Sequence, residues 1–288
     1  MNDFVDLHIH TKFSDGEHSP DDIIKKAFQL GAEYISFTDH DSISAYENIT
    51  CDMGLKIVKG CEFSTKFNGY EIHILGYGLD LKNSELKEYF KILRQTKFER
   101  LKIYKQVLEK NGLIIPNEFY QNIFENNYGI SASRIIFYLQ ENNYNFDRLA
   151  VYKEMMQSAK GVQKPFKNAV EIIELIHKSG AMAFLAHPMD YKLNNFELNN
   201  LVANLKTCGL DGLELYHSEI MPAELPILKK IAEKNHLLIS GGSDFHSKKY
   251  INRNLVNFNS GNPITASQIS AELLTPKNLF AKMIESEK

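Results

Sequence analysis

The sequence predicts an α/β barrel, and three observations favour this fold class. Apolar, strand-like runs alternate with amphipathic, helix-like runs in the first third and in the last two fifths of the chain. Nearly every predicted strand ends in His, Asp or Glu, as expected for a barrel whose site lies at the carboxyl ends of its strands. A length of 288 residues suits one barrel with an insertion, or two ordinary domains.

The first predicted strand carries Asp6, His8 and His10 at alternate positions. Side chains alternate along a strand with a period of two, so all three would emerge on one face. The polar turn Ser14-Asp15-Gly16 follows and can fold a carboxylate back over the end of the strand. Two surface histidines would produce the same His-x-His pattern, so a metal site here depends on the segments that follow.

A helix and three further strands are predicted next, and polar residues accompany each of these strands. Ser19 is expected to cap a helix that begins at Pro20 and ends at Gly31. The strands after it are 34–38, leading into Asp39, His40 and Asp41; 55–63, carrying Glu62; and 70–75, carrying His73. Asn68-Gly69 between the last two is a strong hairpin signal. A histidine inside an apolar run can also be a hydrogen-bonded core residue, and this alternative stays open for His73.

From about residue 84 the apolar pattern takes a helical period that continues to a stop signal at Gly112. Seven Lys and Arg residues between 91 and 110 stand against two Glu residues. They form either the solvated face of an amphipathic helix or a basic wall for a phosphorylated substrate. Further helices are predicted around 133–139 and 145–156.

Strands and helices alternate again from about residue 166. Helices are predicted at 169–178, 195–207 and 222–235, strands at 181–186, 212–217 and 237–240, and a last short helix at Thr275-Pro276. The strands deliver His187, His217 and, through Gly241-Gly242, Asp244 and His246. This region therefore repeats the pattern of polar residues at strand ends.

Composition indicates an ordinary globular chain, with 43% hydrophobic residues, 24% charged residues and a net charge of -3. This balance argues against disorder and against a coat protein that binds nucleic acid through general charge. Three cysteines without paired spacing favour a reducing compartment. The sequence shows neither a signal-peptide pattern nor an apolar run of membrane-spanning length, so we expect a cytoplasmic protein without a membrane partner.

The polar strand-end residues form a candidate metal site. With neutral imidazoles its three carboxylates give a charge of -3, which metal ions would neutralise most simply. Nitrogen and oxygen donors without thiolate suit Zn, Mn or Fe better than Mg or Ca alone. Three divalent ions would make the cluster net positive and attractive to phosphate. The candidate ligands are His8, His10, Asp15, His40, Glu62, His73, His187, Asp244 and His246.

These motifs resemble those of the polymerase and histidinol phosphatase (PHP) family. Its signatures are matched in order by Asp-x-His-x-His at 6–10, Ser-Asp-Gly at 14–16, Thr-Asp-His-Asp at 38–41, Glu62, His73, Ala-His-Pro at 186–188 and Gly-Ser-Asp-Phe-His at 242–246. The resemblance implies a distorted (β/α)7 barrel from residues 1–82 and 165–288. Residues 83–164 would then be a helical insertion that covers the substrate.

The resemblance also implies a metal-dependent phosphoesterase with three divalent ions. One ion would lie among His8, His10, Glu62 and Asp244, a second among Glu62, His73 and His187 with Glu62 as the bridge, and a third among Asp15, His40 and His246. Asp6, Asp39 and Asp41 would orient ligand histidines from behind. The most similar branch contains phosphatases of nucleoside 3′,5′-bisphosphates and exonucleases that remove 5′ nucleotides from short RNA.

In this scheme a metal-bound water, acidified by the ions, attacks phosphorus in line. Glu62 is the central catalytic residue, and His217 is a candidate proton donor or phosphate contact. The branch has Gly-Arg-Pro-His in its insertion, where this chain reads Ser131-Ala132-Ser133-Arg134. Ala132 stands at the position of the branch's arginine, and Arg134 stands at the position of its histidine. Arg134 is either a phosphate clamp or an exposed helix arginine. Lys248 is a further candidate phosphate contact, or a solvated lysine.

We therefore expect hydrolysis of a phosphate ester in a phosphorylated nucleotide or short oligonucleotide, with mono- and diesterase activity both open. A histidinol-phosphate-type phosphatase is the alternative enzyme. A metal-bound PHP module without turnover is the alternative from another class. The sequence gives no indication of the oligomeric state.

Overall fold

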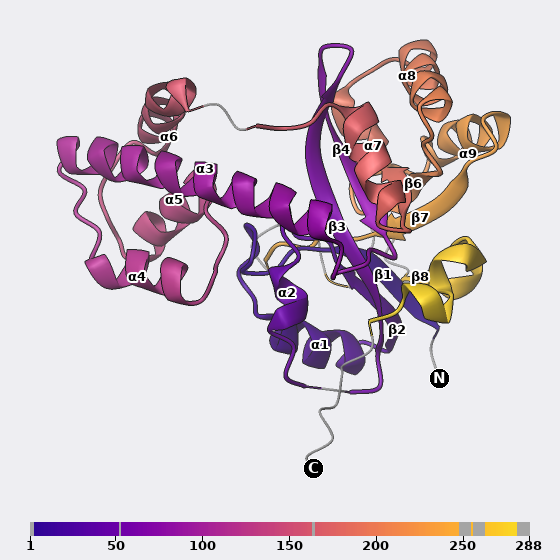
Figure 1. Cartoon of the computed structure of the whole chain (residues 1–288), viewed down its shortest axis with the longest axis horizontal. Coiled ribbons are helices and arrows are strands. Elements are labelled where there is room, and N and C mark those ends of the chain that lie inside the picture. The colour runs from indigo at the N-terminus through magenta and orange to yellow at the C-terminus, as the bar shows by residue number, and fades with distance from the viewer. Residues whose placement is uncertain (1–2, 52, 163–164, 248–254, 256–262, 281–288) are drawn as a thin grey trace.

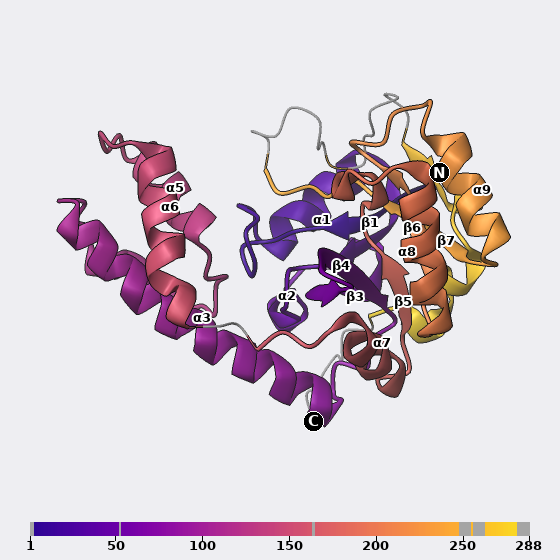
Figure 2. The same cartoon turned by 90° about the horizontal axis from the view of Figure 1, so that it is seen from above.

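A curled sheet of eight strands, with helices around it, forms the larger part of the molecule, and further helices stand to one side (Figures 1 and 2). This computed structural model describes residues 3–51, 53–162, 165–247, 255 and 263–280. The sheet order is β7-β6-β5-β4-β3-β2-β1-β8. The strands are β1 (Phe4–Ile9), β2 (Ala32–Phe37), β3 (Lys56–Phe67), β4 (Tyr70–Tyr77), β5 (Met182–Leu185), β6 (Gly212–His217), β7 (Leu238–Gly242) and β8 (Ile264–Thr265).

The sheet curls until β1 meets the chain that leaves β7, which nearly closes a barrel. Ile9 pairs in parallel with Phe245, and the His10 N–H donates to the Phe245 carbonyl over 2.8 Å. Gly242 permits this approach, since a Cβ on it would lie 2.2 Å from the backbone nitrogen of His8. The two-residue strand β8 pairs antiparallel with the other side of β1. The predicted α/β barrel is confirmed.

Among β1–β7, one strand runs against the others. β3 and β4 form an antiparallel hairpin at Asn68-Gly69, as the sequence predicts, and β4 is also antiparallel to β5. The other neighbouring pairs among β1–β7 are parallel. Because β4 runs in reverse, the beginning of this strand, where His73 lies, meets the carboxyl ends of the parallel strands. His73 therefore comes to the same end of the barrel as Glu62.

Helices cover the outside of the barrel and bury a core against it. They are α1 (Pro20–Gln29), α2 (Ser44–Glu47), α7 (Ala169–Lys178), α8 (Asn195–Thr207) and α9 (Leu225–Lys234). Ser19 caps α1, and capping boxes at Asn168 and Asn194 begin α7 and α8. Helix α9 begins three residues after the predicted Pro222, and the predicted helix near 275 is a single 3-10 turn, Pro276–Asn278.

The remaining helices are α3 (Ser84–Lys110), α4 (Asn117–Glu125), α5 (Ala132–Glu141) and α6 (Arg148–Ser158). They bury a hydrophobic cluster of their own, which includes Leu108, Leu139 and Met155. Helix α3 links the two cores, because Leu93 belongs to the barrel cluster and Leu101 to the helical one. Even α3, with its 27 residues, lacks the apolar character of a membrane span, and so does every other helix among the described residues.

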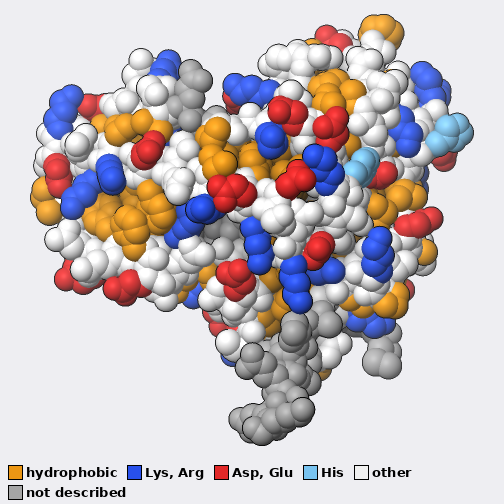
Figure 3. Space-filling view, in the orientation of Figure 1, with side chains coloured by type: hydrophobic (Ala, Val, Ile, Leu, Met, Phe, Trp, Pro, Cys, Tyr) orange, Lys and Arg blue, Asp and Glu red, His pale blue; other side chains and the backbone are white. Residues whose placement is uncertain are grey.

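The basic residues of α3 point in several directions. Arg94 and Arg100 are turned inward and donate to backbone carbonyls, Arg94 to that of Tyr128 and Arg100 to that of Val162. Lys91 and Lys110 pair with Glu88 and Glu154. Figure 3 shows acidic and basic side chains mixed over this face of the molecule. Most of this charge serves helix packing or solvation, whereas Lys97 extends toward the barrel and donates to the His40 carbonyl over 3.3 Å.

Candidate metal centre

The structure brings all nine candidate ligands into one cluster at the carboxyl-end rim of the barrel. His8 and His10 come from β1 and the residue after it, Glu62 from β3 and His73 from β4. The others lie on loops that follow β1, β2, β5 and β7, and these are Asp15, His40, His187, Asp244 and His246. Strand ends that are far apart in the sequence therefore supply one polar site.

Glu62 lies at the centre of this cluster and is fully buried. Each of its oxygens faces different histidines. Oε1 lies 2.8 Å from Nδ1 of His73 and 2.8 Å from Nε2 of His187. Oε2 lies 3.1 to 3.2 Å from ring nitrogens of His8, His10 and His40. Both carboxylate oxygens of Glu62 therefore face imidazole nitrogens, which are atoms that can also bind a metal ion.

The inner part of the cluster contains His8, His10, Glu62 and Asp244, whose ligand atoms all lie within 4.8 Å of one another. Nε2 of His8, Nε2 of His10 and Oε2 of Glu62 are buried and make no hydrogen bond to the described residues. Buried polar atoms normally have partners, and leaving them without one costs free energy. A divalent cation among these nitrogen and oxygen atoms would satisfy them, so the donor set fits a metal.

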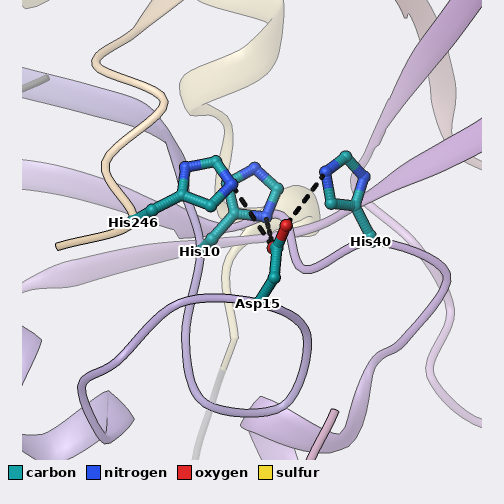
Figure 4. Close-up of side chains that lie close together, drawn as sticks. All are labelled: His10, Asp15, His40 and His246. Atoms are coloured by element: carbon teal, nitrogen blue, oxygen red, sulfur yellow. Dashed lines mark ion pairs between the residues drawn. The ribbon is translucent and has the colours of Figure 1, made fainter. Parts of the chain in front are cut away.

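The outer part of the cluster contains His10, Asp15, His40 and His246, and Figure 4 shows the Asp15 carboxylate between the three imidazoles. Oδ1 of Asp15 lies 3.3 Å from Nε2 of His246 and 3.7 Å from Nδ1 of His10. The side chains of Asp15 and His40 are 26% and 24% exposed, whereas those of His8 and His10 are fully buried. Asp15 and His40 therefore form the side of this part that faces solvent.

The carboxylates of the cluster are ionised and hold protons on neighbouring imidazoles. Burial alone would lower the pKa of His10, but Asp244 and Glu62 raise it to about 10. Burial alone would raise the pKa of Glu62, but the surrounding imidazoles, His40 first, hold it well below its usual range. Burial lowers the pKa of His40 itself to about 3. Cations that bind neutral imidazoles would therefore displace protons from this site.

Three further carboxylates hold the loops that carry the ligands. Asp39 accepts hydrogen bonds from the backbone and hydroxyl of Thr11 and from the hydroxyl of Ser14. Asp6 accepts from both donors of Ser243, and Asp41 accepts from both donors of Ser64. The sequence predicts that these carboxylates orient ligand imidazoles. Their hydrogen bonds to Thr11, Ser14, Ser64 and Ser243 orient backbone and hydroxyl groups beside the ligands.

Glu214 is a buried residue of the site that the sequence analysis missed. Its Oε1 lies 2.9 Å from Nδ1 of His8, and its Oε2 accepts from the backbone N–H of His187 over 2.6 Å. A carboxylate on Nδ1 keeps the proton there and leaves Nε2 free to bind a metal. The one signal in the sequence was a charged residue between Leu213 and Leu215 in an apolar strand.

Three polar residues in or beside the candidate site have a left-handed backbone. The φ angles are 52° for Asp41, 26° for His187 and 53° for Asp244. Such a conformation costs on the order of 1 kcal/mol for residues other than glycine, and it occurs often at functional sites. The hydrogen bond from His187 to Glu214 holds one of these residues in place.

Three residues are predicted to contact substrate, and the structure describes two of them, His217 and Arg134. His217 is buried, with Nε2 3.5 Å from Oδ2 of Asp244 and with Nδ1 accepting from the Glu219 N–H. Arg134 donates from Nη2 to three backbone carbonyls of the loop that carries Asp15. Lys248 lies outside the described residues. The substrate contacts of all three stay predictions.

A cavity of about 210 Å³ opens beside the outer ligands. Asp15, His40 and His73 line it on the barrel side, and Ser131 and Lys97 line it on the side of the helices. A larger cleft of about 340 Å³ lies between α3 and the barrel, and both spaces are lined by Asp41, Lys97 and Ile130. The candidate metal site therefore adjoins a space that can hold more than a phosphate group.

Comparisons with known proteins agree with this architecture. The PHP domain model matches residues 6–179. The chain is 29% identical over 248 residues to the 5′-3′ exoribonuclease Rnm of Escherichia coli K12, covering 84% of each chain. It is 24% identical over 248 residues to the 3′,5′-nucleoside bisphosphate phosphatase of Chromobacterium violaceum, covering 84% of this chain and 87% of the relative.

A solved structure shares the fold. A candidate metal-dependent phosphoesterase from Bifidobacterium adolescentis superimposes with a TM-score of 0.70 at 24% identity, over 94% of this chain and 95% of that one. The family model covers more than half of the chain, and the relatives match it over most of their length. The chain therefore belongs to the PHP-domain family of metal-dependent phosphoesterases, as its strand-end motifs predict.

Proposed function

We propose that this PHP-family phosphoesterase uses three divalent metal ions to hydrolyse a phosphate ester in a phosphorylated nucleotide or short oligonucleotide. The observation that carries the proposal is the position of Glu62, which has histidine nitrogens around both oxygens at the centre of nine clustered ligands. The relatives named as an exoribonuclease and a nucleoside bisphosphate phosphatase support a nucleotide substrate.

Each group of ligands fits one ion of the proposed centre. The inner group is His8, His10, Glu62 and Asp244, the bridged group is Glu62, His73 and His187, and the outer group is Asp15, His40 and His246, with His10 beside it. Nitrogen and oxygen donors suit Zn, Mn or Fe. When bound, such ions would acidify a water molecule and neutralise charge on the phosphate.

His217 is the proposed proton donor to the leaving oxygen. Its Nδ1 accepts from the Glu219 N–H over 3.2 Å, so the proton of the neutral ring stays on Nε2. Nε2 faces the Asp244 carboxylate, which favours retention of that proton. Asp244 thereby links the proposed donor to the inner ligand group.

Lys97 is the proposed phosphate contact at the mouth of the site. Its side chain is 15% exposed, and it lines both the cavity beside the ligands and the cleft under α3. Phe13, Phe90 and Phe98 supply apolar surface in that cleft. Lys87 supplies positive charge there beside Lys97, and the carboxylates of Asp41 and Glu47 also line the cleft. Aromatic and cationic groups together suit a nucleotide or a short single strand. The helices over the cleft support the proposal that residues 83–164 cover the substrate.

We assign the protein to the cytoplasm. Cys51, Cys61 and Cys208 are all free cysteines, which supports a reducing compartment.

Metal content and phosphate release test this function together. Protein loaded with Mn²⁺ or Zn²⁺ should release phosphate or mononucleotide from nucleoside 3′,5′-bisphosphates and dinucleotides faster than phosphate from histidinol phosphate. Lys97→Met should raise KM for these substrates about 5-fold or more, since one charged phosphate contact is lost. Lys102→Met removes the same charge from an exposed position of α3 and should leave KM unchanged.

Other outcomes decide between the alternatives. A preference for histidinol phosphate would select the alternative enzyme. A metal-loaded protein without turnover on any phosphate ester, including a chromogenic aryl phosphate, would favour the non-catalytic module. A protein that takes up no divalent metal would contradict all three.

A further inference from the structure

The loop that carries Asp15, residues 11–16, is held by the insertion as well as by the barrel. Nη2 of Arg134 donates to the carbonyls of Lys12, Ser14 and Gly16 over 2.8, 3.2 and 3.1 Å. These three carbonyls lie on both sides of Asp15 in the sequence. One guanidinium nitrogen therefore draws both halves of the loop together around a candidate metal ligand.

The chain just before α5 makes further contacts with the same loop. The Gly129 N–H donates to the Lys12 carbonyl over 2.9 Å, and Nζ of Lys12 donates to the hydroxyl of Tyr128 over 2.7 Å. The packing is so close that a Cβ on Gly129 would lie 1.7 Å from the Ser14 carbonyl oxygen. Segment 128–134 is therefore docked directly on the loop.

A positive donor is needed where these carbonyls converge. Three carbonyl oxygens around one point repel one another unless a donor lies between them, and a guanidinium provides charged, directional donors there. On the barrel side Asp39 holds Thr11 and Ser14 of the same loop. Asp39 therefore anchors the loop to the barrel, and Arg134 holds the remaining part of the loop in its conformation.

The position of Asp15 depends on the conformation of loop 11–16. Its carboxylate lies 3.3 Å from Nε2 of His246 and 4.0 Å from Nε2 of His40, and its side chain is only partly buried. Glu62 lies on β3, and His10 directly follows β1 and donates its N–H to the Phe245 carbonyl, whereas Asp15 lies on the loop that Arg134 holds. A small displacement of the loop would move the carboxylate away from the histidines of the outer group.

We propose that Arg134 is a positioning residue for the outer metal site. By holding loop 11–16 it places Asp15 against His10, His40 and His246, and it thereby sets the affinity for the outermost ion. The inference rests on the proposed function, because it requires the cluster to bind metal. The sequence left Arg134 as either a phosphate clamp or an exposed helix arginine. The exposed alternative is wrong, because the guanidinium donates to three carbonyls of the loop and the residue is partly buried. The proposed role also differs from the clamp, since Arg134 acts through the loop.

The test compares Mn²⁺ binding in the full-length protein and in two Arg134 variants. After loading and dialysis, Arg134→Ala should retain one ion fewer per chain than the unaltered protein. Its affinity for that ion should fall about 10- to 100-fold, as for other residues that support metal ligands. At limiting Mn²⁺ kcat should fall while KM changes little, and excess Mn²⁺ should restore kcat. Amide hydrogen exchange in residues 11–17 should become faster.

Matched variants complete the design. Arg148→Ala removes the same charge from an exposed position at the start of α6 and should leave metal content and kcat unchanged. Asp15→Asn should lose the same ion, and excess Mn²⁺ should not restore its kcat. Arg134→Lys keeps the charge without the planar fork, should give an intermediate affinity, and decides the question if Arg134→Ala does not fold.

The outcomes separate this inference from the proposed function. If the unaltered protein binds no Mn²⁺ or other divalent ion, the proposed function itself fails. If it binds the ions and the Arg134 variants retain all of them with unchanged affinity, the positioning role is overturned. A rise in KM alone would then identify Arg134 as a phosphate clamp.

Discussion

The inner and outer parts of the ligand cluster are built in different ways. His8, Glu62 and Asp244 of the inner part are almost completely buried, and the first two lie on strands of the barrel. Asp15 and His40 of the outer part are about one quarter exposed and lie on loops. A strand holds a ligand through its sheet hydrogen bonds, whereas a loop needs side-chain contacts to hold one.

The side chains that support the inner part and those that support the outer part come from different regions of the molecule. The inner part is supported by Glu214 on β6 and by Asp6 on β1, both within the barrel. The outer part is supported by Asp39 from the barrel and by Arg134 from α5. Among the described residues, the barrel therefore supports the inner group, and α5 takes part in supporting the outer group.

Glu62→Gln should have the largest effect, because Glu62 belongs to the inner group and to the group with His73 and His187, and its Oε2 also faces His40. An amide offers one acceptor oxygen where the carboxylate has two, so the bridge between the ligand groups is lost. We expect kcat to fall about 10³-fold or more, together with loss of at least one bound ion, while circular dichroism shows an intact fold. Glu71→Gln changes a glutamate that is 80% exposed on β4 and should leave both properties unchanged. Full activity of Glu62→Gln would contradict the assignment.

Much of this architecture is visible in the sequence because local signals are strong. Helices α7 and α8 have their predicted bounds, and each begins with an Asn and Glu capping box. Helix α4 was not predicted, since Pro116 precedes it without a side-chain cap. β8 was missed because two residues become a strand only through their pairing with β1. Local sequence signals thus predict the type and bounds of a helix or strand, whereas the pairing partner of a strand depends on the closed fold.

The same distinction applies to the site. The nine candidate ligands could be collected from the sequence, since each lies in a predicted apolar strand or closely follows one. Glu214 could not be placed, because its importance comes from contact with His8, which is 206 positions away. The bonds from Arg134 to loop 11–16 likewise join residues about 120 positions apart. Contacts of this range require the folded chain.

Glu214→Gln should have an intermediate effect, on His8 of the inner group and on His187 of the bridged group. The carboxylate accepts from Nδ1–H of His8 and from the backbone N–H of His187. An amide has one acceptor oxygen, so one of these contacts must become donor against donor, or His8 must move its proton to Nε2. We expect metal affinity to fall about 10- to 100-fold, measured by competition with a chelator. Glu174→Gln on the exposed face of α7 is the control. Unchanged affinity would show that Glu214 does not support the inner ligands.

The smallest expected effect is a change in the pH dependence of stability after the metal is removed, measured separately from the loss of turnover that the proposed function requires. In the metal-free protein the pKa of His10 is about 10, above the value of about 6.5 in an unfolded chain. Its protonation therefore stabilises the fold below pH 6.5, and this contribution is lost as pH rises toward 10. The pKa of His40 is lowered to about 3, so this residue lowers the stability of the fold as pH falls from about 6.5 toward 3.

Protein treated with a chelator should therefore lose thermal stability between pH 6.5 and 9.5. One pKa unit corresponds to about 1.4 kcal/mol, which is about 3 °C in Tm for a chain of this size. Metal-loaded protein should behave in the opposite way, because the ions bind neutral imidazoles and their affinity rises with pH. The gap in Tm between the two forms should therefore widen across this range, as measured by differential scanning calorimetry. A constant gap would mean that the inner histidines do not exchange protons for metal, and the inner part of the cluster would then lose its role as a metal site.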